Sequence, residues 1–466
     1  MPRLKLSGGV HMPEARDTFS GGIRLVGDPP YIKLCFCKEN MTAILSVGDA
    51  VARGGLLADV SDIGSDIGMP VYSGISGTVT DISEEMRGDG KTYLYITVRG
   101  DGKKLTAKKS PVNKKLSECK PDELIALARM SGIAERSGIP MWQNIRRSRG
   151  HTARVLINAL PCDSEDKTYL CLISEYPERL LCGIKIVLMA VGFRHADIII
   201  SESSGCKDVL LHAVESCGGE QLFSVITAPD IYPLCDDVQL IRAAGGPSPE
   251  IGNEPDETGF AVFDAISCAE LFEAFSDGSA VTDTLLTVSG GCIRKPQTVQ
   301  VPIGTEISEL EKVCDGFWER PMRIINGGRM AGSICRIQDT IGKGTHIIQF
   351  ESSIEAHAER SCIRCGKCVS VCPMRLAPLY LSKYSLEGNV RRCENFRIDA
   401  CTECGCCSYI CPSHIPLVHN IRMGKIWLEN LRDTERSFAD GNLLKKGDSL
   451  KDEEHGEKRT QRRKKR

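Results

Sequence analysis

The sequence predicts a multidomain protein that combines α+β and α/β folds. Its 466 residues correspond to about three domains at roughly 150 residues each, and 41% of them are apolar, enough to form buried cores. The pattern of apolar residues also changes along the chain. Short strands broken by glycines come first, strands and helices then alternate, and a cysteine-rich segment follows. These regions indicate separate folding units.

The balance of charge excludes one broad class of partner. The chain has 59 Lys and Arg residues against 61 Asp and Glu residues, which gives a formal net charge of -2. Because no body-wide positive field is available to neutralise phosphates, no nucleic-acid partner is expected.

No targeting or membrane-spanning segment is expected. Residues 1–20 contain several charges and no apolar core segment, which argues against a secretory signal. The longest apolar stretch, residues 180–193, falls short of the ~20 residues that a transmembrane helix needs. The protein is therefore expected to stay in the cytoplasm.

Residues 1–110 form the first expected domain. Between residues 44 and 98, short apolar runs are separated by glycines, a pattern typical of strands joined by tight turns. The phrases VGDAVARGGLLADV and PVYSGISGTV are similar to biotinyl and lipoyl carrier domains, which fold as a flattened β-barrel sandwich. The hairpin that would present a modified lysine, residues 61–68, contains no lysine. A barrel-sandwich hybrid domain with a structural role is therefore expected.

Residues 111–247 form the second expected domain, in which strands and helices alternate. Strands are expected at residues 153–157, 196–200 and 222–227, and the helix after the first strand should end at Gly192. A second helix is expected around residues 210–214, and the resulting order β-α-β-α-β implies a parallel sheet with crossover helices. Such a frame often binds nucleotides at the strand ends.

A linker and a small α+β module are expected next. Residues 248–282 are assigned to the linker because their first part, residues 248–259, is polar, acidic and rich in turn formers. Residues 283–350 should form the module, with strands at 285–288 and 347–350 and a helix between them at 306–313.

The end of the chain, residues 431–466, is expected to be a charged and disordered tail. Apolar residues are scarce there, and residues 458–466 carry seven basic residues in nine.

Eight of the 23 cysteines fall into two identical motifs, at residues 362–373 and 401–412. Each motif has the spacing Cys-x₂-Cys-x₂-Cys-x₃-Cys-Pro, which is that of bacterial two-cluster ferredoxins. In this pattern three closely spaced thiolates hold one iron–sulfur cube, and the cysteine before the proline reaches the other cube. The expected ligands are Cys362, Cys365, Cys368 and Cys411 for one [4Fe-4S] cluster, and Cys401, Cys404, Cys407 and Cys372 for the second.

Structural zinc is the main alternative for so many thiols. Zinc sites usually place two ligand pairs about 12–20 residues apart, whereas each motif here holds four thiols within eleven positions. Iron–sulfur clusters are therefore favoured. The spacing leaves Cys406 out as a packed thiol, and His414 is expected to be a turn residue. Because such clusters exchange one electron each and bind no substrate, this region should conduct electrons.

Short sequence phrases along the chain, together with the two cysteine motifs, point to a known family. They are GGVHMPE near the start, then VSGG, VPIGT and NGGRMAG, and finally the motifs themselves, CIRCGKCVSVCP and CTECGCCSYICPSHIPL. Together they resemble RnfC, the peripheral electron-input subunit of the Rnf ion-translocating ferredoxin:NAD oxidoreductase. The resemblance covers the chain up to about residue 429 and is most specific in the C-terminal third.

The resemblance implies an identity for each domain. The middle domain would be a Rossmann-like domain similar to the flavoprotein subunit of complex I, which binds NADH and FMN. Residues 283–350 would be a soluble-ligand-binding β-grasp (SLBB) module. Residues 351–430 would be a helical, ferredoxin-like domain with two [4Fe-4S] clusters.

Three phrases depart from the family pattern at the implied nucleotide site. The family's glycine-rich loop, GxGGxGFPT, lets the backbone approach the cofactor phosphates, but this chain reads AERSGIPM with Gly138 as its one glycine. The family's Asn followed by two glutamates around a cysteine survives as NALPCD, from Asn158 to Asp163. Its YPxGxE signature reads YPLCDD and ends at Asp237. Degenerate NADH and FMN motifs near Gly138, Asn158, Asp163 and Asp237 therefore predict a weakened or lost nucleotide site.

The leading hypothesis is an electron-transfer subunit of an Rnf-type redox complex, with two [4Fe-4S] clusters that pass single electrons. Integral membrane subunits are its expected partners on the cytoplasmic face of the membrane, and ferredoxin or NADH is the expected soluble electron partner. Two alternatives stay open. One is a fully active NADH:acceptor oxidoreductase subunit with FMN, and the other is a scaffold whose clusters only stabilise the fold.

Overall fold

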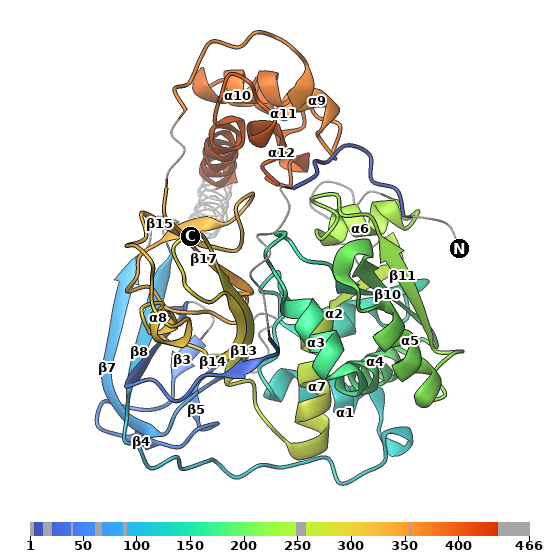
Figure 1. Cartoon of the computed structure of the whole chain (residues 1–466), viewed down its shortest axis with the longest axis vertical. Coiled ribbons are helices and arrows are strands. Elements are labelled where there is room, and N and C mark those ends of the chain that lie inside the picture. Colours follow the sequence, from blue (N-terminus) through green and yellow to red (C-terminus); the bar gives the residue numbers. More distant parts are fainter. Residues whose placement is uncertain are drawn as a thin grey trace, which may run out of the picture. The chain divides into compact units, whose positions relative to one another are not determined.

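The computed structural model of the chain describes residues 4–12, 21–38, 41–60, 68–86, 91–247, 258–353 and 357–436. The chain divides into two compact units, Met1–His357 and Ala358–Arg466. Figure 1 shows that strands and helices build the first unit, whereas helices and loops build the described part of the second. The mixed α/β, multidomain class predicted from the sequence is confirmed.

The N-terminal part of the first unit contains two antiparallel sheets. Along β2, Ile32, Leu34 and Phe36 alternate with more exposed residues and pack into the core, as expected for a strand with one solvated face. The strands and turns predicted between residues 44 and 98 are confirmed where the structure describes them, and residues 61–67 of the lysine-free hairpin lie outside the described residues. The first sheet has the order β2-β8-β7-β4 (Tyr31–Cys37, Thr92–Gly100, Gly77–Met86, Ala50–Val51), and the second β3-β5-β6 (Met41–Ala43, Leu56–Val60, Val71–Tyr72).

Four parallel strands form the sheet that the alternating pattern predicts. Every residue of β10 is buried, as is typical of a parallel strand covered on both faces. Helix α4 ends at Gly192, whose φ of 81° is a left-handed conformation that glycine adopts without strain. In the part of the chain that the structure describes, no helix is long and apolar enough to cross a membrane. The sheet order is β11-β10-β9-β12 (Phe223–Ala228, Ala196–Ser201, Arg154–Ala159, Phe260–Asp264).

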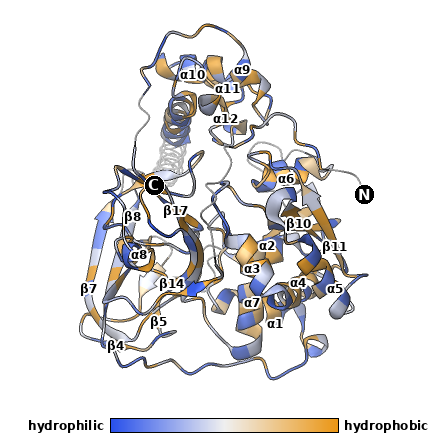
Figure 2. Ribbon diagram, viewed as in Figure 1, coloured by the Kyte–Doolittle hydropathy of each residue, from blue (hydrophilic) through white to orange (hydrophobic). Residues whose placement is uncertain are grey.

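Helices pack around this sheet, and α4 and α7 approach each other very closely. A Cβ atom at Gly183 would lie 1.8 Å from the carbonyl oxygen of Cys268, so only glycine permits this approach. Figure 2 shows hydrophobic and hydrophilic residues mixed along α4 and α7, as expected of helices with one buried face. The helices are α1 (Pro121–Met130), α2 (Met141–Ser148), α3 (Thr168–Glu175), α4 (Pro177–Val191), α5 (Lys207–Ser216), α6 (Asp237–Ala243) and α7 (Ala265–Asp277).

The linker predicted for residues 248–282 is wrong in its second half. Strand β12 and helix α7 occupy residues 260–277, and β12 pairs in parallel with β9. Ala261, Val262 and Phe263 of β12 are buried in the sheet, with Phe263 fully so. The polar segment before them suggested a linker, although it precedes the fourth strand of the sheet. Residues 248–257 lie outside the described residues.

The third part of the first unit is a six-stranded sheet with the small helix α8 (Glu309–Val313). The predicted strands at 285–288 and 347–350 are confirmed as parts of β13 and β17, and the predicted helix at 306–313 contains α8. Leu286, Val288 and Phe350 are fully buried in its core. The order is β1-β14-β13-β17-β15-β16 (Arg24–Leu25, Gln297–Pro302, Asp283–Ser289, Ile347–Glu351, Arg323–Asn326, Ser333–Cys335).

The second unit is small and helical in its described part. Its core contains Leu381, Cys393, Ile398 and Ile421. A helix over residues 417–436 runs six residues past the predicted start of the disordered tail, so the tail prediction is wrong for residues 431–436. The rest of that tail, residues 437–466, lies outside the described residues. The short helices are α9 (Lys367–Ser370), α10 (Pro378–Leu386), α11 (Val390–Asn395) and α12 (Cys406–Tyr409).

Candidate functional site

The two cysteine motifs have matching backbone conformations in the second unit. Arg364 and Glu403, at the same position of each motif, are left-handed with φ of 55° and 54°. Gly366 and Gly405, which precede α9 and α12, are also left-handed with φ of 77° and 82°. Each motif therefore folds as a tight loop that leads into a short helix.

Two cavities in the second unit are each lined by four of the expected ligands. Cys362, Cys365, Cys368 and Cys411 line one cavity, and Cys372, Cys401, Cys404 and Cys407 line the other. Each set takes three thiols from one motif and the fourth from the other motif. This is the grouping that crossed ligation requires. The assignment of these cysteines as ligands stays a prediction.

The donor groups around both cavities suit an iron–sulfur cube. Backbone N–H groups point at the sulfur atoms: Arg364 N to Cys362 Sγ at 3.4 Å, and Glu403 N to Cys401 Sγ at 3.4 Å. Leucine, isoleucine, valine, methionine and proline side chains form much of the remaining lining. N–H donors stabilise thiolate charge and apolar walls exclude water, two properties by which proteins tune such clusters.

The arrangement differs from that of a single-ion site. Within the described residues, no three His, Cys, Asp or Glu side chains are grouped so that they could hold one metal ion. A cube binds each thiolate through a different iron, so its ligands surround a cavity rather than a point. Burial raises the pKa of Cys401 to about 11 and that of Cys407 to about 12, so thiolates there need nearby positive charge.

Two further residues of this region, Cys406 and His414, are not expected to be ligands. Cys406 is fully buried on α12 and lines the second cavity, and a hydrogen bond with Cys404 followed by burial raises its pKa. Its exclusion from the ligand set stays a prediction. His414 is exposed in a turn, with its N–H donating to the carbonyl of Cys411 at 3.1 Å.

The residues predicted for the nucleotide site do not all come together. Asn158 lies at the C-terminal end of β9, where its Nδ2 donates to the carbonyl of Cys235 at 2.9 Å and to Asp237 Oδ1 at 3.0 Å. Asp163 instead faces the six-stranded sheet and accepts a hydrogen bond from Gln349 at 3.3 Å. Gly138 occupies an open turn, because a Cβ atom there would meet nothing within 4 Å. Only Asn158 and Asp237 are neighbours.

Arg136 belongs to the loop that stands in place of the family's glycine-rich loop, and its side chain contacts the parallel sheet. The Arg136 guanidinium donates to the carbonyl of Leu160 at 3.0 Å and to Cys162 Sγ at 2.8 Å, and it lies 3.3 Å from an Asp264 carboxylate oxygen. It also stacks over the ring of Tyr169, with 4.8 Å to the ring centroid. Arg136 therefore occupies the C-terminal ends of β9 and β12, the edge at which parallel sheets bind ligands.

Glu135 adds a second buried ionisable group beside this edge. Its Oε2 accepts the backbone N–H of Asp264 at 2.8 Å, and its side chain is 5% exposed. Burial, followed by repulsion from Asp264, raises the pKa of Glu135 to about 8. The sequence marked this loop as a departure in glycine content. It gave no sign that both side chains turn inward.

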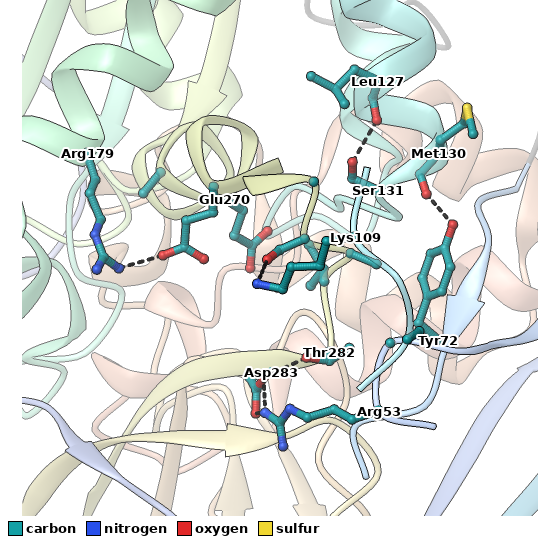
Figure 3. A pocket seen from close by; sticks show the side chains of 18 of the residues that line it. Arg53, Tyr72, Lys109, Leu127, Met130, Ser131, Arg179, Glu270, Thr282 and Asp283 are labelled. Atoms are coloured by element: carbon teal, nitrogen blue, oxygen red, sulfur yellow. Dashed lines mark hydrogen bonds and ion pairs between the residues drawn. The ribbon is translucent and has the colours of Figure 1, made fainter. Parts of the chain in front are cut away.

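A larger cavity of about 910 Å³ lies elsewhere in the first unit (Figure 3). Ion pairs cross its walls, including Arg53 with Asp283 at 2.5 Å and Arg179 with Glu273 at 2.6 Å. Burial and the neighbouring Glu273 raise the pKa of Glu270 in the same wall. Its volume is in the range of small-molecule sites. None of the residues predicted for the nucleotide or cluster sites lines it.

Comparison with known proteins finds one matching domain family and several relatives that are C subunits of ion-translocating oxidoreductase complexes. A family described as a 4Fe-4S dicluster domain matches residues 355–416. The C subunit of the Na⁺-translocating ferredoxin:NAD⁺ oxidoreductase complex of Acetobacterium woodii is 26% identical over 83% of this chain and 89% of its own. The proton-translocating counterpart of Clostridium ljungdahlii is 27% identical over 73% and 74%. The corresponding protein of the ion-translocating oxidoreductase complex of Rhodobacter capsulatus is 26% identical over 91% and 83%.

Among solved structures, an NAD⁺-reducing [NiFe]-hydrogenase in the air-oxidized state aligns with 64% of this chain and 60% of its own, at 14% identity and a TM-score of 0.42.

Proposed function

This chain is a relative of the RnfC subunits over most of its length, and on that basis we propose that it is the electron-transfer subunit of an Rnf-type ion-translocating redox complex. It carries a 4Fe-4S dicluster domain. Single electrons would pass through its clusters between a soluble partner, ferredoxin or NADH, and integral membrane subunits at the cytoplasmic face of the membrane. The observation that carries the proposal is the pair of cavities, each lined by thiols from both motifs.

The protein contributes ligands, orientation and exclusion of water at these sites. A [4Fe-4S] cluster supplies one-electron exchange when it is bound. Cys362 and Cys365 are exposed at the first cavity, whereas Cys407 is buried at the second and its three companions are half-buried. Because the thiols of the first site are the more exposed, we assign that site to electron exchange with partners and the second site to the interior of the electron path. Exposure and N–H donors also set the reduction potential of each cluster.

We also propose identities for the three parts of the first unit. The paired antiparallel sheets support a barrel-sandwich hybrid domain, the parallel sheet a domain similar to the complex I flavoprotein, and the six-stranded sheet an SLBB-type module. The second of these would run from residue 111 through α7. Its nucleotide site would be impaired, because Arg136 and Glu135 fill the strand ends that a cofactor would need.

Anaerobic purification with metal and flavin quantitation tests this function. We expect two [4Fe-4S] clusters per chain, reducible by a strong chemical reductant or reduced ferredoxin, and no bound FMN. Stoichiometric zinc without a cluster signal would overturn the cluster assignment. One FMN per chain together with cluster reduction by NADH would establish the fully active NADH:acceptor alternative instead.

A further inference from the structure

We propose that Cys162 and Cys235 form a redox-active dithiol, in which Cys162 is the nucleophile toward a hydroperoxide and Cys235 closes the disulfide. The site lies at the C-terminal end of β9, outside the cysteine motifs. It goes beyond the proposed electron-transfer function and does not depend on the clusters.

The chain holds the two thiols together through the end of β9. The Cys162 and Cys235 side chains lie close enough for each to shift the pKa of the other. Asn158, the fifth residue of β9, fixes the main chain at Cys235 by donating to its carbonyl at 2.9 Å. Arg136 fixes the other partner by donating to both the Leu160 carbonyl and Cys162 Sγ. Both cysteines therefore reach the same point from different loops.

Fixed positive charge selects which thiol ionises. The Arg136 guanidinium lies 2.8 Å from Cys162 Sγ. The hydrogen bond from Cys235, then Arg136 and His346, lower the pKa of Cys162 well below its usual range in spite of burial. The same hydrogen bond and burial raise the pKa of Cys235. The guanidinium therefore favours the thiolate at Cys162, and the proton of the pair stays on Cys235.

Cys162 and Cys235 also differ in how far they are exposed to solvent. Cys162 is half-buried, whereas Cys235 is 8% exposed. Cys162 is therefore the more exposed residue of the pair, as expected of the thiol that a hydroperoxide meets first. Other buried cysteines of the first unit differ, because burial raises the pKa of Cys171 and Cys206 and leaves them as unreactive thiols. Those two residues serve as internal controls.

The reaction balances without any group beyond the hydroperoxide. The Cys162 thiolate attacks the terminal oxygen of ROOH, the O–O bond breaks, and the alkoxide leaves as ROH after taking a proton from water, which gives a sulfenic acid at Cys162. The Cys235 sulfur then attacks the sulfenic sulfur, the S–S bond forms, and hydroxide leaves with the Cys235 proton as water. Two electrons pass from the two thiols to the peroxide.

Two residues of the proposed dithiol site stand at positions where this chain departs from the RnfC pattern. Cys235 stands where the YPxGxE signature has its glycine, and Arg136 stands in the loop where the family has several glycines. The second thiol and the cation therefore both lie in the positions that impair the nucleotide site.

Peptide mapping of the anaerobically purified full chain tests the proposal. After treatment with a stoichiometric amount of hydrogen peroxide and alkylation of the remaining thiols, we expect a peptide pair linked through Cys162 and Cys235. In Cys235→Ser, Cys162 should instead be trapped as a sulfenic acid by dimedone, while Cys171 and Cys206 stay alkylated. Disulfide formation in Arg136→Gln should be at least about tenfold slower, since loss of the guanidinium raises the thiol pKa.

The cysteine peptides are read separately from any damage to the clusters, so loss of cluster signal does not affect the result. Because Arg136→Gln also removes the contact with Asp264, His346→Gln is the second variant, and it should slow the reaction as well. Absence of the 162–235 disulfide in the wild-type chain, or oxidation of Cys171 and Cys206 at the same rate as Cys162, would overturn the proposal.

Discussion

Two side chains, Glu135 and Arg136, decide the chemistry at the C-terminal ends of β9 and β12. Glycines at these positions would leave the strand ends open to a phosphate-bearing cofactor. Here the Glu135 carboxyl group accepts the N–H of Asp264, and the Arg136 guanidinium contacts Cys162 and Tyr169. In place of an open binding surface, the loop therefore forms a buried hydrogen-bonded network.

The raised pKa of Glu135 predicts a pH dependence of stability. Its folded-state pKa of about 8 lies above the ordinary value of 4.5, so the folded state binds the proton more tightly than the unfolded chain. Stability from this group is complete below about pH 4.5 and is lost as the pH rises to about 8. The loss amounts to a few kcal/mol at most, since one pKa unit corresponds to about 1.4 kcal/mol.

Denaturant unfolding of wild type and Glu135→Gln across this pH range measures the effect. The free energy of unfolding of the wild type should fall relative to the variant as the pH rises. Glu118, an exposed glutamate of the same unit, gives the matched control Glu118→Gln, which should follow the wild type. A constant difference between wild type and Glu135→Gln from pH 4.5 to 8 would contradict the assignment.

At the scale of elements, the two cysteine motifs form one interlocked pair. The last cysteine of each motif lines the cavity of the other: Cys411 stands with Cys368, and Cys372 with Cys401. Neither motif therefore completes a four-thiol site by itself.

This interlock predicts that substitutions in different motifs damage the same cluster. Cys368→Ala and Cys411→Ala should each remove the signal of one cluster and leave the other, because both thiols belong to the first cavity. Cys372→Ala should remove the other signal. Iron quantitation and electron paramagnetic resonance of the three variants distinguish the two clusters.

Cys406→Ala is the control for these variants, since this buried thiol adjoins the second cavity without being an expected ligand. It should retain both clusters. If Cys411→Ala affects the same cluster as Cys401→Ala, the ligation is not crossed.

At the scale of the whole molecule, distant parts of the sequence build the first unit. Arg24 and Leu25 of β1 pair with Val299 and Gln300 of β14, in parallel. The buried core also continues from the N-terminal sheets to the parallel sheet and its helices. The first unit is therefore one compact unit that contains three kinds of sheet.

The proposed location of the whole chain can also be tested. We expect it to pellet with membranes only in cells that contain the integral partner subunits, with residues 458–466 dispensable. Seven basic residues there could each contribute about 1 kcal/mol at an anionic surface, although salt screens this attraction within a Debye length. Cell fractionation distinguishes recruitment by partner subunits from attraction of the basic tail to the membrane. The full chain is compared with a chain truncated after residue 457, each in cells with and without the partner subunits.

Pelleting of the full chain in cells without partners, combined with loss of pelleting on truncation, would make the basic tail the anchor. Recruitment by partners would then not be the main cause.

The sequence by itself determined the features that depend on local spacing. The periodicity of apolar residues located α4, β10 and β13, because burying one face of a helix or both faces of a strand imposes a fixed repeat. The doubled cysteine motif indicated a dicluster domain, because four thiols at these separations suit one kind of metal centre. The similarity to RnfC rests on the same local phrases.

Only the tertiary structure decided what lies at the end of β9. The sequence marked Gly138, Asn158, Asp163 and Asp237 as one degenerate site, yet only Asn158 and Asp237 meet. It also placed β12 in a linker, because a strand at the sheet edge is recognised through its pairing with β9, more than 100 residues earlier. Contacts between Arg136, Cys162 and Cys235 depend on where three loops converge. No periodicity or motif records such convergence, since it is fixed by the packing of the sheet and not by neighbours along the chain.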